Sequence, residues 1–220
     1  MRRGIGYLTL LSGLAALAGA VGPWIPHPAV GLRVAGFDLF EMTGIFPAVR
    51  AGAVPVFREA FVLPLLLSAL VVALAPVVDR RLPSFLRWVC PVLGAALALT
   101  ALPPYPAILT AYRDPMYRLR FYLTVGAVLL AATSPLLRRL SPRTVGGGLA
   151  ALAAVGFGLP LAQYIRVRPL FDALYGRPVG VGWGLILYLA GMGLLFLLGL
   201  ATLLAFATPE TQRAQRFSSQ

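Results

Sequence analysis

Six long apolar runs constrain this chain more than any other feature, because their central parts hold no charged residue. A segment in hydrocarbon must satisfy its own backbone hydrogen bonds, and about 20 helical residues cross a core of about 30 Å. Barrel strands would alternate in polarity along the chain, which these runs do not. The sequence therefore predicts an all-α integral membrane protein, a single domain (1–220) with six transmembrane helices. The predicted spans are approximately 4–22, 61–78, 85–102, 121–137, 145–161 and 181–206.

The connections between these runs alternate between short and long. We therefore expect three helical hairpins, each closed by a long loop on the same side of the membrane. The long loops are residues 23–60, 103–120 and 162–180, and the chain ends in a polar tail, 208–220. Within the first loop, aromatic residues between Phe37 and Phe46 are mixed with Asp38 and Glu41. This mixture predicts a short amphipathic cap, lying on the membrane surface or over the bundle.

Arginine placement indicates the orientation. The chain has 19 basic residues, all arginine, and the predicted topology places 10 on one side and 9 on the other, so the count does not decide. The Arg-Arg pairs, however, lie in the short segments next to helix ends, and five of the seven carboxylates lie in the long loops. By the positive-inside rule we expect both termini in the cytoplasm of a bacterial-type cell membrane. A cleaved signal peptide at the N-terminus is the less favoured alternative to a first helix.

Composition excludes several kinds of function. A net charge of +12 would suggest nucleic acid if the arginines formed one patch, but they lie in short clusters between apolar runs. One cysteine, Cys90, and one histidine, His27, rule out the usual zinc site and a bis-histidine haem within the chain. No phosphate loop or hydrolase motif is present, so we expect no cofactor and no metal. Spans without central charges argue against ion-coupled transporters, proton pumps and voltage sensors.

The three long loops share arginines, carboxylates, aromatics and prolines. They predict either a docking surface for a partner or the mouth of a binding cavity. The alternative is simple interface anchoring, with solvated arginines and local ion pairs. The candidate residues of this outer surface are Trp24, Asp38, Glu41, Arg113, Asp114, Arg166, Arg168, Asp172 and Arg177.

Small residues recur at every fourth position in two of the runs, where they predict ridges on which another helix can pack closely. We expect these ridges to pack within the chain, with packing against another subunit as the alternative. The ridges are Ser12, Ala16 and Ala20 in the first run, and Gly146, Ala150, Ala154 and Gly158 in the fifth. Six short spans with Ala16 and Ala20 on the first helix are similar in outline to the substrate-binding subunits of energy-coupling-factor vitamin transporters. That similarity covers helix number and this ridge, without a vitamin-contact motif.

Three hypotheses for function follow. The first is a non-catalytic accessory or scaffold subunit of a membrane complex, whose partners are the lipid bilayer and other membrane proteins. The second is a binding or permease component for a small apolar or anionic molecule or a lipid, which requires a cavity between helices. The third is an intramembrane enzyme, which requires that loop carboxylates or His27 converge in one cleft.

Overall fold

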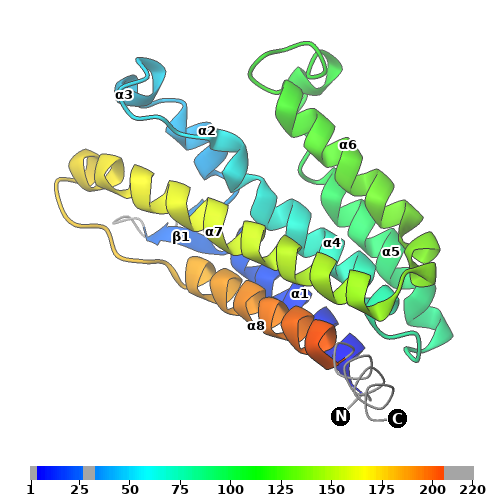
Figure 1. The fold of residues 1–220 in the computed structure, drawn as a ribbon. Coiled ribbons are helices and arrows are strands. Elements are labelled where there is room, and N and C mark those ends of the chain that lie inside the picture. The colour runs from blue at the N-terminus through cyan, green and yellow to red at the C-terminus, as the bar shows by residue number, and fades with distance from the viewer. Residues whose placement is uncertain (1–3, 27–32, 206–220) are drawn as a thin grey trace, which may run out of the picture.

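The computed structural model describes residues 4–26 and 33–205, and this part of the chain is mostly helical (Figure 1). Its long helices are α1 (Ile5–Val21), α4 (Leu63–Val78), α5 (Ser84–Leu99), α6 (Arg118–Thr133), α7 (Pro142–Tyr175) and α8 (Trp183–Ala205). The shorter elements are β1 (Pro23–Pro26), β2 (Arg33–Ala35), α2 (Leu39–Thr43), α3 (Pro47–Arg50), η1 (Arg58–Phe61), η2 (Ala107–Leu109) and η3 (Ser134–Arg139). The polar tail and His27 lie outside the described residues.

Helix α4 forms the centre of the molecule. Helices α1, α5, α6 and α7 all pack against it, and 12 of its 16 residues are buried. A helix that is apolar on every side is stable where every side is covered, which explains this position. Its hydroxyl residue, Ser68, donates to the carbonyl of Pro64 at 2.6 Å, so this buried hydroxyl is satisfied within its own helix.

Three helices are long and apolar enough to cross a membrane: Arg118–Arg139, which joins α6 and η3, then α7, then α8. Only 28%, 33% and 39% of their most apolar windows is buried inside the protein. The remaining apolar surface needs a lipid environment, since soluble monomers rarely expose such large apolar patches. These features support a membrane protein. Helices α1, α4 and α5 are also apolar but shorter, with 17, 16 and 16 residues.

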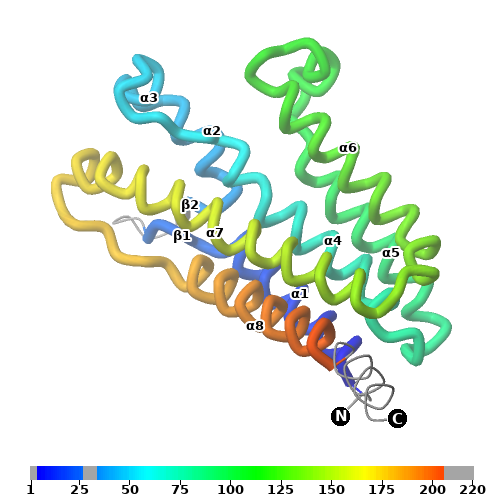
Figure 2. The backbone as a smooth tube through the Cα atoms, viewed as in Figure 1, coloured from blue at the N-terminus to red at the C-terminus, as the bar shows by residue number. Residues whose placement is uncertain are grey.

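The helices place two kinds of connection at opposite ends of the bundle, as Figure 2 also shows. The α4–α5 and α6–α7 connections lie near the start of α1 and the end of α8. The segment from β1 to η1, the α5–α6 loop and the α7–α8 connection lie at the other end. We name residues 23–26 and 33–61 the cap, and the end of the bundle that carries them the cap end. Helix α2 corresponds to part of the amphipathic segment that the sequence predicts between Phe37 and Phe46.

Helix α7 corrects the prediction of a long loop at residues 162–180. It continues for 34 residues to Tyr175, through Pro160 and Pro169. Each proline removes only one backbone donor, and the buried face of the helix continues beyond them to Phe171. Packing of that face offsets the lost hydrogen bonds. The helix ends at Gly176, whose φ of 64° is the left-handed conformation that terminates many helices.

The predicted ridge on α1 packs inside the chain. Ser12, Ala16 and Ala20 are all buried. Opposite them on α8 lies Gly191, where a Cβ atom would stand 2.8 Å from the carbonyl oxygen of Ser12 and from the amide nitrogen of Ala16. Glycine at this point lets the two backbones approach closely, as expected for small-residue packing in membranes.

The ridge on α7 is only half correct. Gly146 and Ala150 are buried against α8, where a Cβ on Gly199 would lie 2.7 Å from the amide nitrogen of Ala150. Ala154 and Gly158, in contrast, are exposed. A step of four residues overshoots one helical turn by about 40°, so three such steps rotate a residue off the contact face.

Candidate functional site

Trp24 does not lie on the outer surface that the sequence predicts. Its side chain is fully buried, and its indole Nε1 donates to the carbonyl oxygen of Gly19 at 3.0 Å. Its ring contacts Tyr164 and Tyr188, at centroid distances of 6.2 and 5.6 Å. A tryptophan at a helix end fits either the membrane interface or a core with an acceptor for its N–H. Here Trp24 lies in the core, where the Gly19 carbonyl accepts its N–H, and its contacts join β1 to α1, α7 and α8.

A buried arginine instead forms the most unusual polar site at the cap end. Arg120, in the first turn of α6, is 1% exposed and is the one charged residue buried within the described ranges. Its Nε and Nη2 donate to the carbonyl oxygens of Ala101 and Leu102, at 2.8 and 3.1 Å. These carbonyls follow the end of α5, where acceptors without intrahelical partners and the negative end of the helix dipole gather. Arg120 therefore caps the C-terminal end of α5 by binding these carbonyl oxygens.

Glu41 from the cap completes this site. Nη1 of Arg120 lies 2.9 Å from Oε1 of Glu41, in an ion pair between α6 and α2. The hydroxyl of Tyr117 donates to Oε2 of the same carboxylate at 3.3 Å. The Glu41 side chain is 41% exposed, so the pair is buried on one side and reaches solvent on the other. Burial and the Glu41 charge raise the pKa of the Tyr117 phenol above its ordinary value, which keeps it a donor.

Aromatic rings cover the remaining faces of the guanidinium. Arg120 lies 4.7 Å from the ring centroid of Phe37 and 5.0 Å from that of Phe40. Arg58 lies 4.4 Å from the centroid of the same Phe40 ring and donates to the Phe40 carbonyl through Nε and Nη2, at 2.9 and 2.6 Å. Cation–π contacts and carbonyl acceptors thus offset the cost of burying this charge. The site fastens the cap to the bundle.

The predicted loop carboxylates hold local backbone turns. Asp38 accepts from the amide of Ala35 at 2.9 Å, and Asp114 accepts from the amide of Met116 at 2.8 Å. Asp172 lies on α7 and accepts from the amide of Val179 at 2.6 Å, near which Arg168 donates to the Val179 carbonyl at 3.1 Å. These carboxylates therefore do not converge in one cleft. Within the described ranges, no three His, Cys, Asp or Glu residues are grouped to hold a metal ion.

The predicted arginines divide into two groups. Arg166 on α7 donates to the carbonyl of Pro55 at 2.8 Å and so ties the cap to that helix, as Arg168 ties the α7–α8 connection. Arg113 and Arg177 are exposed. The Arg113 guanidinium lies 4.9 Å from the ring centroid of its neighbour Tyr112. Arg113 and Arg177 therefore remain available at the surface.

The α5–α6 loop, residues 100–117, is the most exposed apolar feature at the cap end. Tyr105 is 81% exposed and Leu109 is 64% exposed. Tyr112, Met116 and, in the first turn of α6, Leu119 are also exposed. The loop projects from the α5–α6 pair beyond the rest of the bundle in Figure 1.

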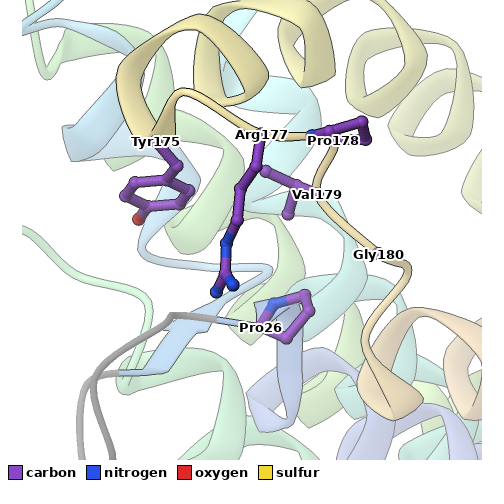
Figure 3. Close-up of a pocket in the computed structure, with 6 residues that line it drawn as sticks. All are labelled: Pro26, Tyr175, Arg177, Pro178, Val179 and Gly180. Carbon is purple, nitrogen blue, oxygen red and sulfur yellow. The ribbon is translucent and has the colours of Figure 1, made fainter.

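A small pocket of about 230 Å³ lies between the end of α7 and the cap. In Figure 3 the side chain of Arg177 extends between Tyr175 and Pro26, and Pro178, Val179 and Gly180 form the wall. Drug-sized ligands usually occupy pockets of about 300–1,000 Å³, so this one suits a small molecule or ion at most.

Sequence reasoning treated Arg120 as one of many loop arginines and missed its role, together with those of Arg58 and Tyr117. One signal was present. Arg120 continues the buried face of α6, which contains Thr124, Ala127 and Ala131 at spacings of four, three and four. A charged residue in register with a stripe of small residues indicates a buried partner.

Comparisons of the chain with protein families, with curated proteins and with solved structures give no match.

Proposed function

We propose that this protein is a non-catalytic accessory subunit of a complex in a bacterial-type cytoplasmic membrane. It would span the membrane six times, as three hairpins, with both termini in the cytoplasm and the cap outside. The placement of the long connections at one end supports this topology (Figure 1). Helix α1, with 17 residues, is at the short end of the range of about 17–25 that spans a bilayer, and α4 and α5, with 16 each, fall just below it. For α4, η1 extends the helical segment towards the cap.

Packing of the core favours a subunit over a permease. A permease component would need a cavity between helices, whereas α4 is covered on nearly every side and α8 meets α1 and α7 through backbone contacts at glycine. In the cap, Asp38, Arg50 and Arg58 bond to backbone groups of the cap itself, and Glu41 pairs with Arg120. They support a structural role for most of the surface that the sequence offered for docking.

The observation that carries the proposal is the exposed α5–α6 loop. Tyr105 and Leu109 present apolar surface in the same loop as Arg113, and the Asp114 carboxylate forms no ion pair among the described residues. Aromatic residues with arginine are the composition that protein interfaces favour. We propose that the occupant is a second membrane protein with an apolar, acidic surface next to the bilayer, because such a surface complements these side chains.

Site-specific photo-crosslinking in native membranes tests this proposal. A photo-reactive residue in place of Leu109 should give one protein adduct of defined mass, and gentle extraction with native mass spectrometry should return the same partner in fixed stoichiometry. The matched control replaces Ile45, which is 54% exposed on the cap, and should not give this adduct. Charge reversal by Arg113→Glu with Arg118→Glu should lower the adduct yield about tenfold or more, since like charges across an interface repel.

Two outcomes would contradict the subunit proposal. Lipid adducts alone at position 109 would make the loop an interface anchor. Equal capture of the same protein at positions 109 and 45 would make the contact non-specific.

The pocket beside Arg177 favours one second candidate, the binding of a small anion. Arg177 lines the pocket and is exposed. Isothermal titration of the purified protein with small carboxylates and phosphate tests this, with Arg177→Gln as the variant and Arg50→Gln as the control. Retention of equal affinity in Arg177→Gln would eliminate this candidate.

A further inference from the structure

The end of the bundle opposite the cap carries a concentrated positive charge. Two segments meet there, residues 79–87 around the α4–α5 turn and residues 134–143 around the α6–α7 turn, which we name the basic turns. Together they contain six arginines and one carboxylate, Asp79. Contacts of η3 with α4 and α5 place the two segments side by side.

Backbone hydrogen bonds hold the arginines of the two turns close to one another. The guanidinium of Arg80 donates to the carbonyl oxygen of Arg138. Nη2 of Arg138 in turn donates to the carbonyl oxygen of Arg87 at 2.6 Å. The Nε atom of Arg138 is buried and has no hydrogen-bond partner in the described part of the chain. The side chains of Arg80 and Arg138 are therefore held in a row that ends at the backbone of Arg87.

The one carboxylate leaves most of this charge unpaired. Asp79 accepts from the backbone amide of Arg81 at 3.0 Å, and among the described residues it forms no ion pair with an arginine side chain of the basic turns. Like charges held together at a membrane surface repel each other, and an anion placed between them would relieve that repulsion. Guanidinium groups bind phosphate oxygens with strong, charge-assisted hydrogen bonds.

An apolar surface adjoins the arginines on α5. Phe85 and Trp88 are each 69% exposed, and their spacing of three residues puts them on one face in the first turns of that helix. One turn further on, Val92 is also 69% exposed. Aromatic residues of this kind mark the headgroup level of a bilayer. In addition, the first turn of α5 has no side-chain cap, so its amides add partial positive charge beside Arg87.

We propose that the basic turns bind the headgroup of an anionic phospholipid. The phosphate group would be held by Arg80 and Arg138 at the first turn of α5, beside Arg87. The acyl chains would lie along the exposed face of α5 formed by Phe85, Trp88 and Val92. This apolar face is why the ligand is a lipid rather than free phosphate. The site lies at the opposite end from the surface proposed for the partner protein, and neither depends on the other.

Native mass spectrometry of the full chain in detergent tests the site. Titration with phosphatidylglycerol should give a saturable one-lipid adduct, and phosphatidylcholine should not. Arg80→Gln combined with Arg138→Gln should weaken phosphatidylglycerol binding by about 25-fold, at about fivefold for each basic residue near an anionic lipid surface. Arg113→Gln combined with Arg50→Gln removes the same charge at the cap end and should change the affinity less than about twofold.

A second measurement on the unaltered chain keeps the test open if the double variant does not fold. Thermal unfolding, followed by a thiol-reactive dye at the buried Cys90, should shift upward with phosphatidylglycerol and not with inorganic phosphate. An equal shift with inorganic phosphate would make the ligand a free anion and overturn the lipid assignment. Equal binding of both lipids, or equal losses in the two double variants, would overturn the site itself.

Discussion

At the cap end, Arg120 is buried, donates to two carbonyls beyond the end of α5 and pairs with the Glu41 carboxylate. At the opposite end, Arg138 donates to the backbone carbonyl of Arg87, in a segment with other arginines and without a recorded carboxylate partner. The same residue type thus has two roles. Where aromatic rings and a carboxylate surround a buried arginine, its charge is paired within the protein and it joins elements of the fold. Where the recorded partners are carbonyls alone, as for Arg80 and Arg138, no carboxylate pairs the charge, which we propose stays available to a ligand. Counting arginines on each side cannot separate these roles, but their partners can.

The largest loss of stability that tests this comparison is expected on replacing Arg120. Arg120→Ala removes the donors that close the end of α5 and the partner of Glu41, so we expect a loss of about 3 kcal/mol of stability. The measurement is thermal or denaturant unfolding in detergent, read by dye labelling of Cys90. The control Arg118→Ala changes an exposed arginine two residues earlier and should cost less than about 0.5 kcal/mol. Equal losses in the two variants would remove the distinction between joining and available arginines.

The α1–α8 contact, which lies between the two ends of the bundle, gives the next largest expected effect. Gly191→Ala places a methyl group 2.8 Å from backbone atoms of Ser12 and Ala16, and should cost about 2 kcal/mol through overpacking. Gly193→Ala on the same helix meets no atom within 4 Å and should be neutral or slightly stabilising. The readout is again the unfolding midpoint. A neutral Gly191→Ala would mean that the α1–α8 contact is looser than described.

A smaller effect is expected at Trp24. Trp24→Phe removes the donor to the Gly19 carbonyl and leaves a small void, at a cost of about 1 kcal/mol. Trp88→Phe, at a position 69% exposed, should leave stability unchanged without added lipid. Tryptophan fluorescence and unfolding midpoints give both values. If Trp24→Phe were silent and Trp88→Phe costly, the assignment of one tryptophan to the core and the other to the membrane interface would be reversed.

The smallest effect is expected at the basic turns. Arg81 is exposed, and its recorded bond to Asp79 uses the backbone amide, which Arg81→Gln retains. Stability without lipid should therefore change by less than about 0.5 kcal/mol. Unfolding in lipid-free detergent measures this. A loss as large as that of Arg120→Ala would place Arg81 among the joining arginines.

The helical segments could be predicted because their signals are local. Apolar runs at 61–78 and 181–206 correspond to helices at 63–78 and 183–205. The number of membrane spans and the orientation stay predictions. The extension of α7 past Pro160 could not be predicted, because it depends on packing of residues such as Tyr164 and Phe171 against distant segments.

The central site was not predictable for the same reason. Arg120 and Glu41 are 79 residues apart, and no local pattern announces their pairing. Trp24 gave an ambiguous signal, since an amphipathic ring at a helix end suits both lipid headgroups and a core acceptor. The loop carboxylates were expected to gather at a surface, but nearby backbone amides were available partners for Asp38, Asp114 and Asp172. Local hydrogen bonding of this kind competes with any functional cluster.

The central position of α4 has a consequence for how the protein is made. In the proposed six-span topology, the N-terminal part of the chain emerges first, so α4 would enter the membrane before α5, α6, α7 and α8 exist to surround it. Until then its neighbours would be mostly lipid chains, which later give way to protein. Because the Ser68 hydroxyl bonds within its own helix, α4 would expose no unsatisfied side-chain donor to lipid before the other helices surround it. The helix is therefore suited both to lipid and to the protein interior, and assembly replaces its lipid neighbours with apolar side chains of the other helices.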